Sequence, residues 1–141
     1  MQQQDWHRRA VRILTVLFAA AVAVSVVHYV DNVVDYTDFP RSDGGPNPSR
    51  GLVAAAWFVF TAAGVAGYVL FRREPSTLSL VLLAFYSGSG LVGLGHYTVP
   101  GAFDMPVLRQ AHVVADILLG TAMFAFVIWA ARSRAPTPRP G

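Results

Sequence analysis

The chain has 141 residues, of which 54% are hydrophobic and only 13% are charged. Soluble domains carry about a quarter charged residues, and a chain this short cannot bury so much apolar surface, so the composition argues against a soluble globular domain. The absence of cysteine excludes disulfides, thiolate metal sites and thiol catalysis.

Four long apolar runs follow one another along the chain, at residues 11–34, 52–71, 78–99 and 107–131. Each run reaches the roughly 20 residues that a helix needs to cross the hydrocarbon core of a bilayer. Backbone groups in lipid must bond within their own segment, which favours helices over any other structure. The sequence therefore predicts a single all-α transmembrane domain over residues 1–141, folded as a four-helix bundle.

Polar segments separate these runs and follow the last one. Residues 35–51 form the longest connector, and their prolines and glycines predict an irregular loop. Residues 72–77 and 100–106 predict two shorter connections. The tail over residues 132–141 is rich in Arg and Pro, and we expect it to be disordered. The first run could also be a cleaved signal peptide, but it continues without a polar break, so we expect it to remain as a membrane anchor.

The arginines predict how the bundle is oriented. Eight of them fall on one side of the predicted helices, and only Arg41, Arg50 and Arg109 fall on the other. Because basic residues are enriched in cytoplasmic segments, both termini are predicted to be cytoplasmic in a multi-pass protein of the cell membrane. Since the arginines flank apolar helices, they are topology signals, and a nucleic-acid partner is not expected.

A candidate site lies at the predicted extracytoplasmic end. His28, His96 and His112 come from three different helices at a similar depth. His28, Asp31 or Asn32, and Asp35 share one helix face, as do Arg109, His112 and Asp116. Asp116 carries the strongest signal, because an unpaired charge in the hydrocarbon costs several kcal/mol. The alternative interpretation is that these groups have only a structural role and hold the helices together.

Imidazoles and carboxylates without sulfur suit a divalent transition metal, with Zn or Fe as the first candidates. Three His and one Asp also match the donor set of catalytic zinc sites, which keep one position open for water. The sequence therefore predicts a metal site made of His28, His96, His112 and Asp116. Asp31 and Asp35 are reserve ligands or hydrogen-bond partners of the ligands.

Three classes of function remain open. The first is a metal-binding membrane protein, which could be an enzyme acting on a lipid-like substrate from the bilayer. The second is an accessory subunit of a larger membrane complex, in which two His ligate haem b or the carboxylates relay protons. The third is a structural protein without chemistry. Membrane lipid is the expected partner in each class, together with self-association or a larger complex.

The third apolar run also predicts close helix packing. Ser89 and Gly93 lie on the same face as His96 and form a pair of small residues four apart. Such pairs let two helix backbones approach closely in membranes. We therefore expect this face to point into the bundle, with a kink or a groove as the alternative interpretation of the residues 87–90.

Overall fold

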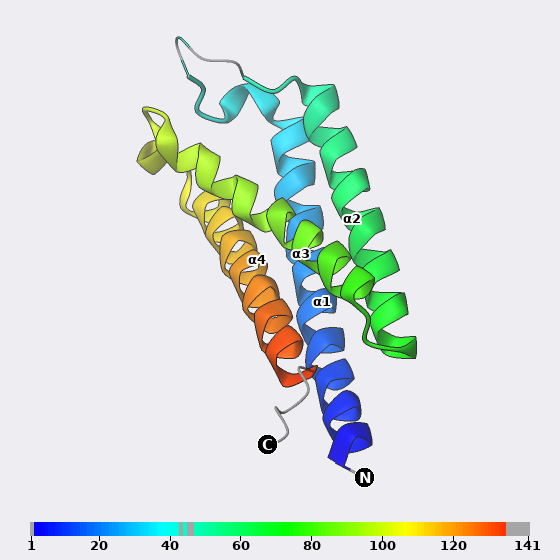
Figure 1. Cartoon of the computed structure of the whole chain (residues 1–141). Helices are drawn as coiled ribbons and strands as arrows, with labels where there is room; N and C mark the ends of the chain where they lie inside the picture. Colours follow the sequence, from blue (N-terminus) through cyan, green and yellow to red (C-terminus); the bar gives the residue numbers. More distant parts are fainter. Residues whose placement is uncertain (1, 43, 45–46, 135–141) are drawn as a thin grey trace.

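The computed structural model describes residues 2–42, 44 and 47–134. Four long helices dominate it: α1 (Gln2–Val34), α2 (Arg50–Arg73), α3 (Thr77–Leu91) and α4 (Val107–Arg134) (Figure 1). Three short 3-10 helices complete the described part: η1 (Tyr36–Asp38), η2 (Val92–Thr98) and η3 (Ala102–Asp104). The prediction of an all-helical chain with four long helices is confirmed.

The four segments are suited to a membrane by length and composition. They are Gln3–Val34, Arg50–Arg73, Thr77–Thr98, with α3 and η2 counted together, and Val107–Ser133. Large apolar side chains also point outward along them, with exposed fractions of 72% at Val16, 66% at Phe58 and 63% at Leu118. A soluble protein rarely exposes apolar side chains in such numbers. These features suggest a membrane protein.

The largest differences from the sequence prediction lie at three boundaries. α1 begins at Gln2 rather than at residue 11, because aromatic contacts hold its first turns: the rings of Trp6 and Trp129 lie 5.9 Å apart. α4 continues to Arg134 instead of ending at residue 131, so residues 132–134 are helical and not disordered. The rest of the predicted disordered tail, residues 135–141, lies outside the described residues. The third boundary is the end of α3.

α3 ends at Leu91, and the chain continues as the 3-10 helix η2 to Thr98. The prediction of one α-helix over residues 78–99 is therefore wrong in its last two turns. The change follows the glycine-rich stretch in which Gly88, Gly90, Gly93 and Gly95 lower the helix propensity. A 3-10 segment is more tightly wound than an α-helix, so it places His96 differently from a continuous helix.

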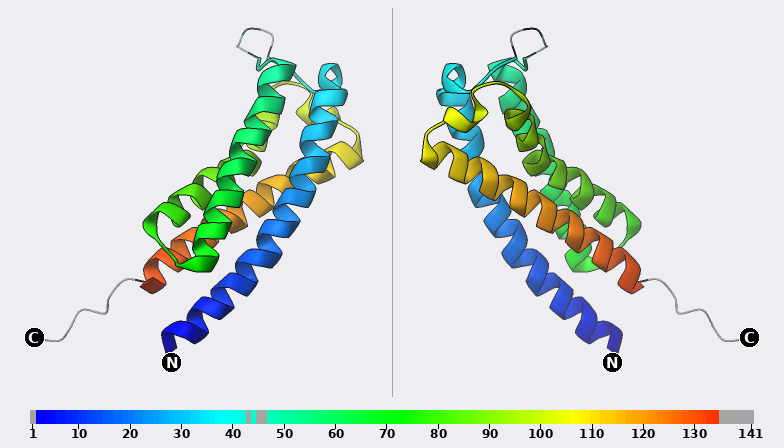
Figure 2. Two further views of the ribbon diagram at one scale, coloured as in Figure 1. Left: turned by 90° about the vertical axis from the view of Figure 1, so that its right-hand side faces the viewer. Right: turned by 90° about the vertical axis from the view of Figure 1, so that its left-hand side faces the viewer.

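The helices form a ring, in which α1 packs against α2 and α4, while α3 packs against the same two helices from the opposite side (Figure 2). The largest buried side chains of the shared core come from all four helices and include Leu14, Phe71, Leu83, Tyr86 and Met123. A short connection joins α2 to α3, where Ser76 and Ser79 make a capping box at the start of α3. This packing fixes the helices along most of their length.

α3 and α4 approach each other most closely at Gly90 and Gly120. A Cβ atom added at Gly120 would lie 2.8 Å from the carbonyl oxygen of Ser87, and one at Gly90 would overlap the backbone carbonyl of Asp116. Backbones can approach this closely only where a side chain is missing. Gly93, from the predicted small pair, is buried against Ile117 and His28. The crossing therefore sets the position of Asp116 relative to η2.

Candidate functional site

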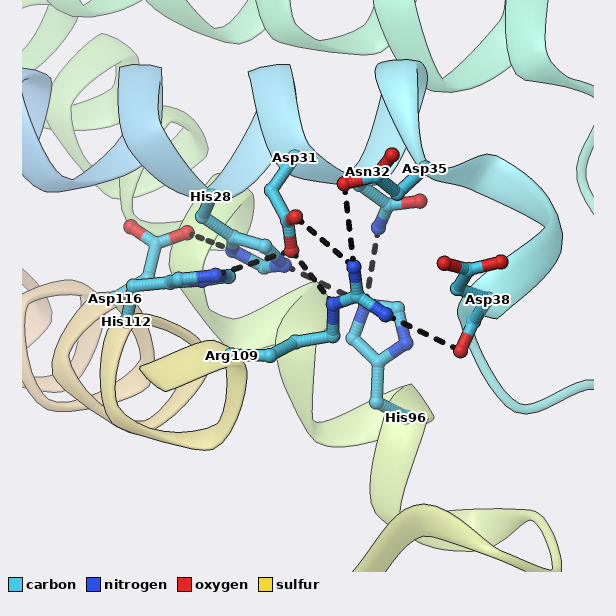
Figure 3. Close-up of polar contacts among 9 residues, drawn as sticks. All are labelled: His28, Asp31, Asn32, Asp35, Asp38, His96, Arg109, His112 and Asp116. Atoms are coloured by element: carbon cyan, nitrogen blue, oxygen red, sulfur yellow. Dashed lines mark hydrogen bonds and ion pairs between the residues drawn. The ribbon is translucent and has the colours of Figure 1, made fainter. Parts of the chain in front are cut away.

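The polar side chains gather at one end of the bundle, which we call the distal end: the end away from Gln2, where η1, η2 and η3 lie. The chain crosses the bundle four times, so α1 arrives at this end, α2 and α4 leave from it, and α3 leads into it through η2. His28 and Asp31 come from α1, His96 from η2, and Arg109, His112 and Asp116 from α4 (Figure 3).

His28 and Asp116 form a buried pair between α1 and α4. Nδ1 of His28 lies 2.7 Å from Oδ2 of Asp116, and each side chain is only 3% exposed. No other hydrogen bond to the Asp116 carboxylate is present among the described residues. An ionised carboxylate is an acceptor only, so an ionised Asp116 pairs with a proton on Nδ1 of His28. The pairing fixes the orientation of the His28 ring and directs its Nε2 atom toward η2.

His96 continues this contact on the other side of His28. The two Nε2 atoms lie 3.4 Å apart, within hydrogen-bond distance. The amide nitrogen Nδ2 of Asn32 lies 3.1 Å from the same Nε2 atom of His96. Asp116, His28 and His96 thus form one chain of hydrogen bonds, which we call the Asp–His–His chain, with Asn32 as a further partner (Figure 3).

The amide of Asn32 constrains the protons of this chain. An amide nitrogen only donates, so in this orientation Nε2 of His96 accepts, and the ring proton of His96 resides on Nδ1. Nε2 of His96 has one lone pair, which accepts from the amide, and Nε2 of His28 lies 3.4 Å from the same atom. A proton on Nε2 of His28 would make this ring an imidazolium between a carboxylate and a neutral imidazole.

A second cluster lies nearer to the end of the bundle, around Asp31. Arg109 makes two hydrogen bonds to its carboxylate, from Nε to Oδ2 at 2.8 Å and from Nη2 to Oδ1 at 3.1 Å. Nε2 of His112 lies 3.1 Å from Oδ2 of the same carboxylate. Arg109 also reaches Asp35 at 3.4 Å and the backbone carbonyl of Asp38 at 3.3 Å. The bidentate geometry is the strong form of this interaction.

An aromatic ring lies between His96 of the first cluster and Arg109 of the second. The ring centroid of Phe39 lies 4.9 Å from that of His96 and 4.5 Å from the guanidinium carbon of Arg109. Phe39 is buried with Met105 and Val113 in a small apolar core beneath the loops. Sequence reasoning missed Phe39, and it placed Asn32 on the same helix face as His28 without giving it a role. The spacing of Asn32 from His28 was visible, but nothing in the sequence singled out its partner in η2.

The predicted metal residues meet, although in two groups. The ring centroid of His28 lies 5.5 Å from that of His96 and 5.6 Å from that of His112. Asp116 contacts His28, whereas Asp31 contacts His112 and Arg109, and Asp35 reaches only Arg109. Within residues 2–42, 44 and 47–134, no group of three or more His, Asp or Glu side chains is arranged to hold a metal ion. Metal binding therefore stays a prediction without support from the arrangement of these side chains.

A cavity of about 680 Å³ adjoins the Asp–His–His chain. His28, Asn32 and His96 contribute to its wall from α1 and η2. The opposite wall comes from α2, with Val53, Ala56 and Phe60, and the distal rim comes from the segment between η1 and α2. This volume lies within the range of about 300–1,000 Å³ that is typical of small-molecule sites.

No family model, curated protein or solved structure matches this chain. The function of the protein is therefore inferred from its side-chain geometry alone.

Proposed function

We propose that this is a four-helix membrane protein that takes up and releases a proton at the Asp–His–His chain. This function corresponds to the proton-handling class predicted from the sequence, and it rests on one structural observation. The chain joins a carboxylate that is 2% exposed, through His28, to His96 at the wall of a cavity. Ionisable residues are rare inside membranes and often mark proton pathways.

The hydrogen bonds allow two states that differ by one proton. In the loaded state, His28 is an imidazolium that donates to Asp116 and to Nε2 of His96, and His96 carries its own proton on Nδ1. In the empty state, His28 keeps only the proton on Nδ1, while Nε2 of His96 donates to Nε2 of His28. A proton arriving at Nδ1 of His96 displaces the one on Nε2 toward His28, as imidazoles with two distinct nitrogens can do.

Asn32 follows the exchange between these states. In the loaded state its amide nitrogen donates to Nε2 of His96, which matches the contact of 3.1 Å. In the empty state Nε2 of His96 is a donor, so the amide must turn by 180° to present its oxygen or release the contact. Nδ1 of His96 has no hydrogen-bond partner among the described residues, and His96 lines the cavity, so this atom is proposed as the entry point for the proton.

The orientation proposed for this protein places both termini in the cytoplasm and the distal end outside. The asymmetry of the arginines supports it, since Arg8, Arg9, Arg12, Arg72 and Arg73 lie at the end opposite the site. The cavity would then exchange protons with the extracytoplasmic side. On the cytoplasmic side of the site, the apolar core around Leu14, Leu83 and Met123 closes the bundle, so the chain is proposed as a site reached from one side.

Nitrogen NMR of histidine-labelled protein in lipid nanodiscs tests the proposal, because imidazolium and neutral imidazole give different nitrogen shifts. At neutral pH, the nitrogen signals of His28 in the wild-type protein should be those of an imidazolium, and they should disappear in His28→Gln. Asp116→Asn removes the counterion, so His28 should become neutral while the bundle still folds. Asp104→Asn is the control, because it removes an exposed carboxylate at the same end without touching the site.

A neutral His28 in the wild-type protein across the pH range in which it stays folded would overturn the proposal. The same samples also test the predicted metal site. If the purified protein contains one metal ion per chain and His28→Gln contains none, the site binds a metal ion instead of a proton. A haem would require the two imidazoles to separate around a porphyrin, and a visible spectrum detects it.

A further inference from the structure

The cavity beside the Asp–His–His chain has walls of two different kinds. Toward the distal rim it is polar, with Arg41, Ser42 and Asn47 from the segment between η1 and α2. Toward the middle of the bundle it is apolar, with Val53, Ala56 and Phe60 from α2 and Val92 from η2. Leu52 and Phe60, which both line it, are eight residues apart, so the apolar part extends about 12 Å along the helix axis.

The charges at the polar end point to an anion. Arg41 is the one described lining residue with a fixed charge, and no described lining residue is acidic. Its guanidinium lies 4.2 Å from the ring centroid of Tyr36 and donates one hydrogen bond, from Nη2 to the backbone carbonyl of Tyr36 at 3.0 Å. A guanidinium has five N–H donors, so this anchoring leaves others to bind a ligand.

Two described carboxylates at the distal end do not neutralise Arg41. Asp31 and Asp35 face Arg109, on the other side of Phe39. Their negative charge is therefore directed to α4 and away from the cavity. His96 adds a further polar contact on the cavity wall, since its Nδ1 atom has no partner among the described residues.

We infer that this cavity binds a single-chain amphiphile with an anionic head group, a carboxylate or a phosphate. The head group lies between Arg41 and His96, and the hydrocarbon chain lies along α2 toward Phe60. The cavity volume of about 680 Å³ suits one chain of a small ligand better than a two-chain lipid. This inference deepens the proposed function, because it names the ligand that meets the proton entry point, and it rests on that function only through His96.

Equilibrium binding to the full chain in nanodiscs of uncharged lipid tests the inference with four probes of equal chain length. These probes are hexadecanoate, hexadecyl phosphate, hexadecanol and hexadecyltrimethylammonium. At least one anionic probe should bind with a stoichiometry near one, about tenfold or more tighter than hexadecanol, as expected for a single hydrogen bond to a charged group. The cationic probe should bind more weakly than hexadecanol. The two anionic probes show whether the head group is a carboxylate or a phosphate.

Two pairs of variants locate the binding. Arg41→Gln should weaken the anionic probe about tenfold, to the level of hexadecanol, whereas Arg73→Gln, an exposed arginine at the opposite end of α2, should not. Ala56→Trp fills the apolar part and should weaken every probe at least tenfold. Ala55→Trp is its control, because Ala55 is the neighbouring residue and is exposed on the outer face of α2.

Equal binding of all four probes, or equal binding by Ala56→Trp and Ala55→Trp, would overturn the inference, because both results describe partitioning into lipid. Either result leaves the proton site intact, since histidine NMR of the ligand-free protein measures that site separately. Conversely, selective anion binding by a protein whose His28 stays neutral would retain the cavity ligand and reject the proton chain.

Discussion

The crossing of α3 and α4 at Gly90 should control both the stability of the bundle and the geometry of its site. In Gly90→Ala, the added methyl group would lie 3.2 Å from Cα of Gly120 and 3.0 Å from the carbonyl carbon of Asp116, and closer still to the oxygen of that carbonyl. These are backbone atoms, which cannot rotate away. The two helices must therefore separate, and Asp116 must move relative to His28.

The expected loss of stability follows from two opposing contributions, and a second variant in the same helix separates them. Overpacking costs about 1–3 kcal/mol, while replacing glycine by alanine within a helix gains about 0.5–1 kcal/mol. Gly90→Ala should therefore lower the free energy of unfolding by about 1–2 kcal/mol. In Gly88→Ala, the new methyl group meets only the Phe60 ring, at 3.3 Å and beyond. Gly88→Ala should therefore gain the stability that alanine gives a helix and lose little through overpacking.

Unfolding in mixed micelles, followed by the helical circular dichroism signal, measures this difference. The two alanine variants should differ by about 2–3 kcal/mol, and the imidazolium signal of His28 should weaken only in Gly90→Ala. Equal stability of the two variants would refute the close approach of α3 and α4. A destabilised Gly90→Ala with an unchanged His28 signal would refute the coupling of this crossing to the site.

Two further predictions concern the distal cluster and the orientation. Arg109→Gln should lower the free energy of unfolding by about 1–3 kcal/mol, because it leaves the partly buried Asp31 without its bidentate partner. Arg109→Lys should restore only part of the lost stability. Equal stability of the wild type and both variants in denaturant titrations would contradict this prediction. Reporter enzymes that function only outside the cytoplasm should be active when inserted at Gly44 and inactive at Glu74, and the reverse pattern would invert the bundle.

Hydrophobic length and residue spacing were sufficient to predict the four helices. The apolar runs are long, and the outward-facing apolar residues follow no demanding pattern, so composition alone identifies them. The helix ends were less predictable, because they depend on contacts between distant segments. His7 bonds through Nε2 to the backbone carbonyl of Phe71 at 3.0 Å, and no local signal in residues 2–10 indicates that partner.

The candidate site was predictable as a set of residues, but its pairings were not. Depth along each helix placed His28, His96 and His112 together, since rise per residue is a fixed quantity. Which acid faces which imidazole depends on helix rotation and on the 3-10 winding of η2. The sequence predicted Asp116 as a metal ligand, yet its carboxylate contacts Nδ1 of His28. Small differences of rotation decide such contacts, and the periodicity of a single sequence does not fix them.

The two carboxylates at the distal end have different partners and therefore different chemistry. Asp31 faces a guanidinium, whose positive charge is permanent, and it is 21% exposed; its charge is satisfied whether or not His112 holds a proton. Asp116 is 3% exposed and faces only an imidazole among the described residues. Its negative charge needs the proton on His28, because a buried charge without a partner is costly. Under the proposed function, Asp31 is therefore a fixed structural acid, and Asp116 is the counterion of the imidazole that exchanges the proton.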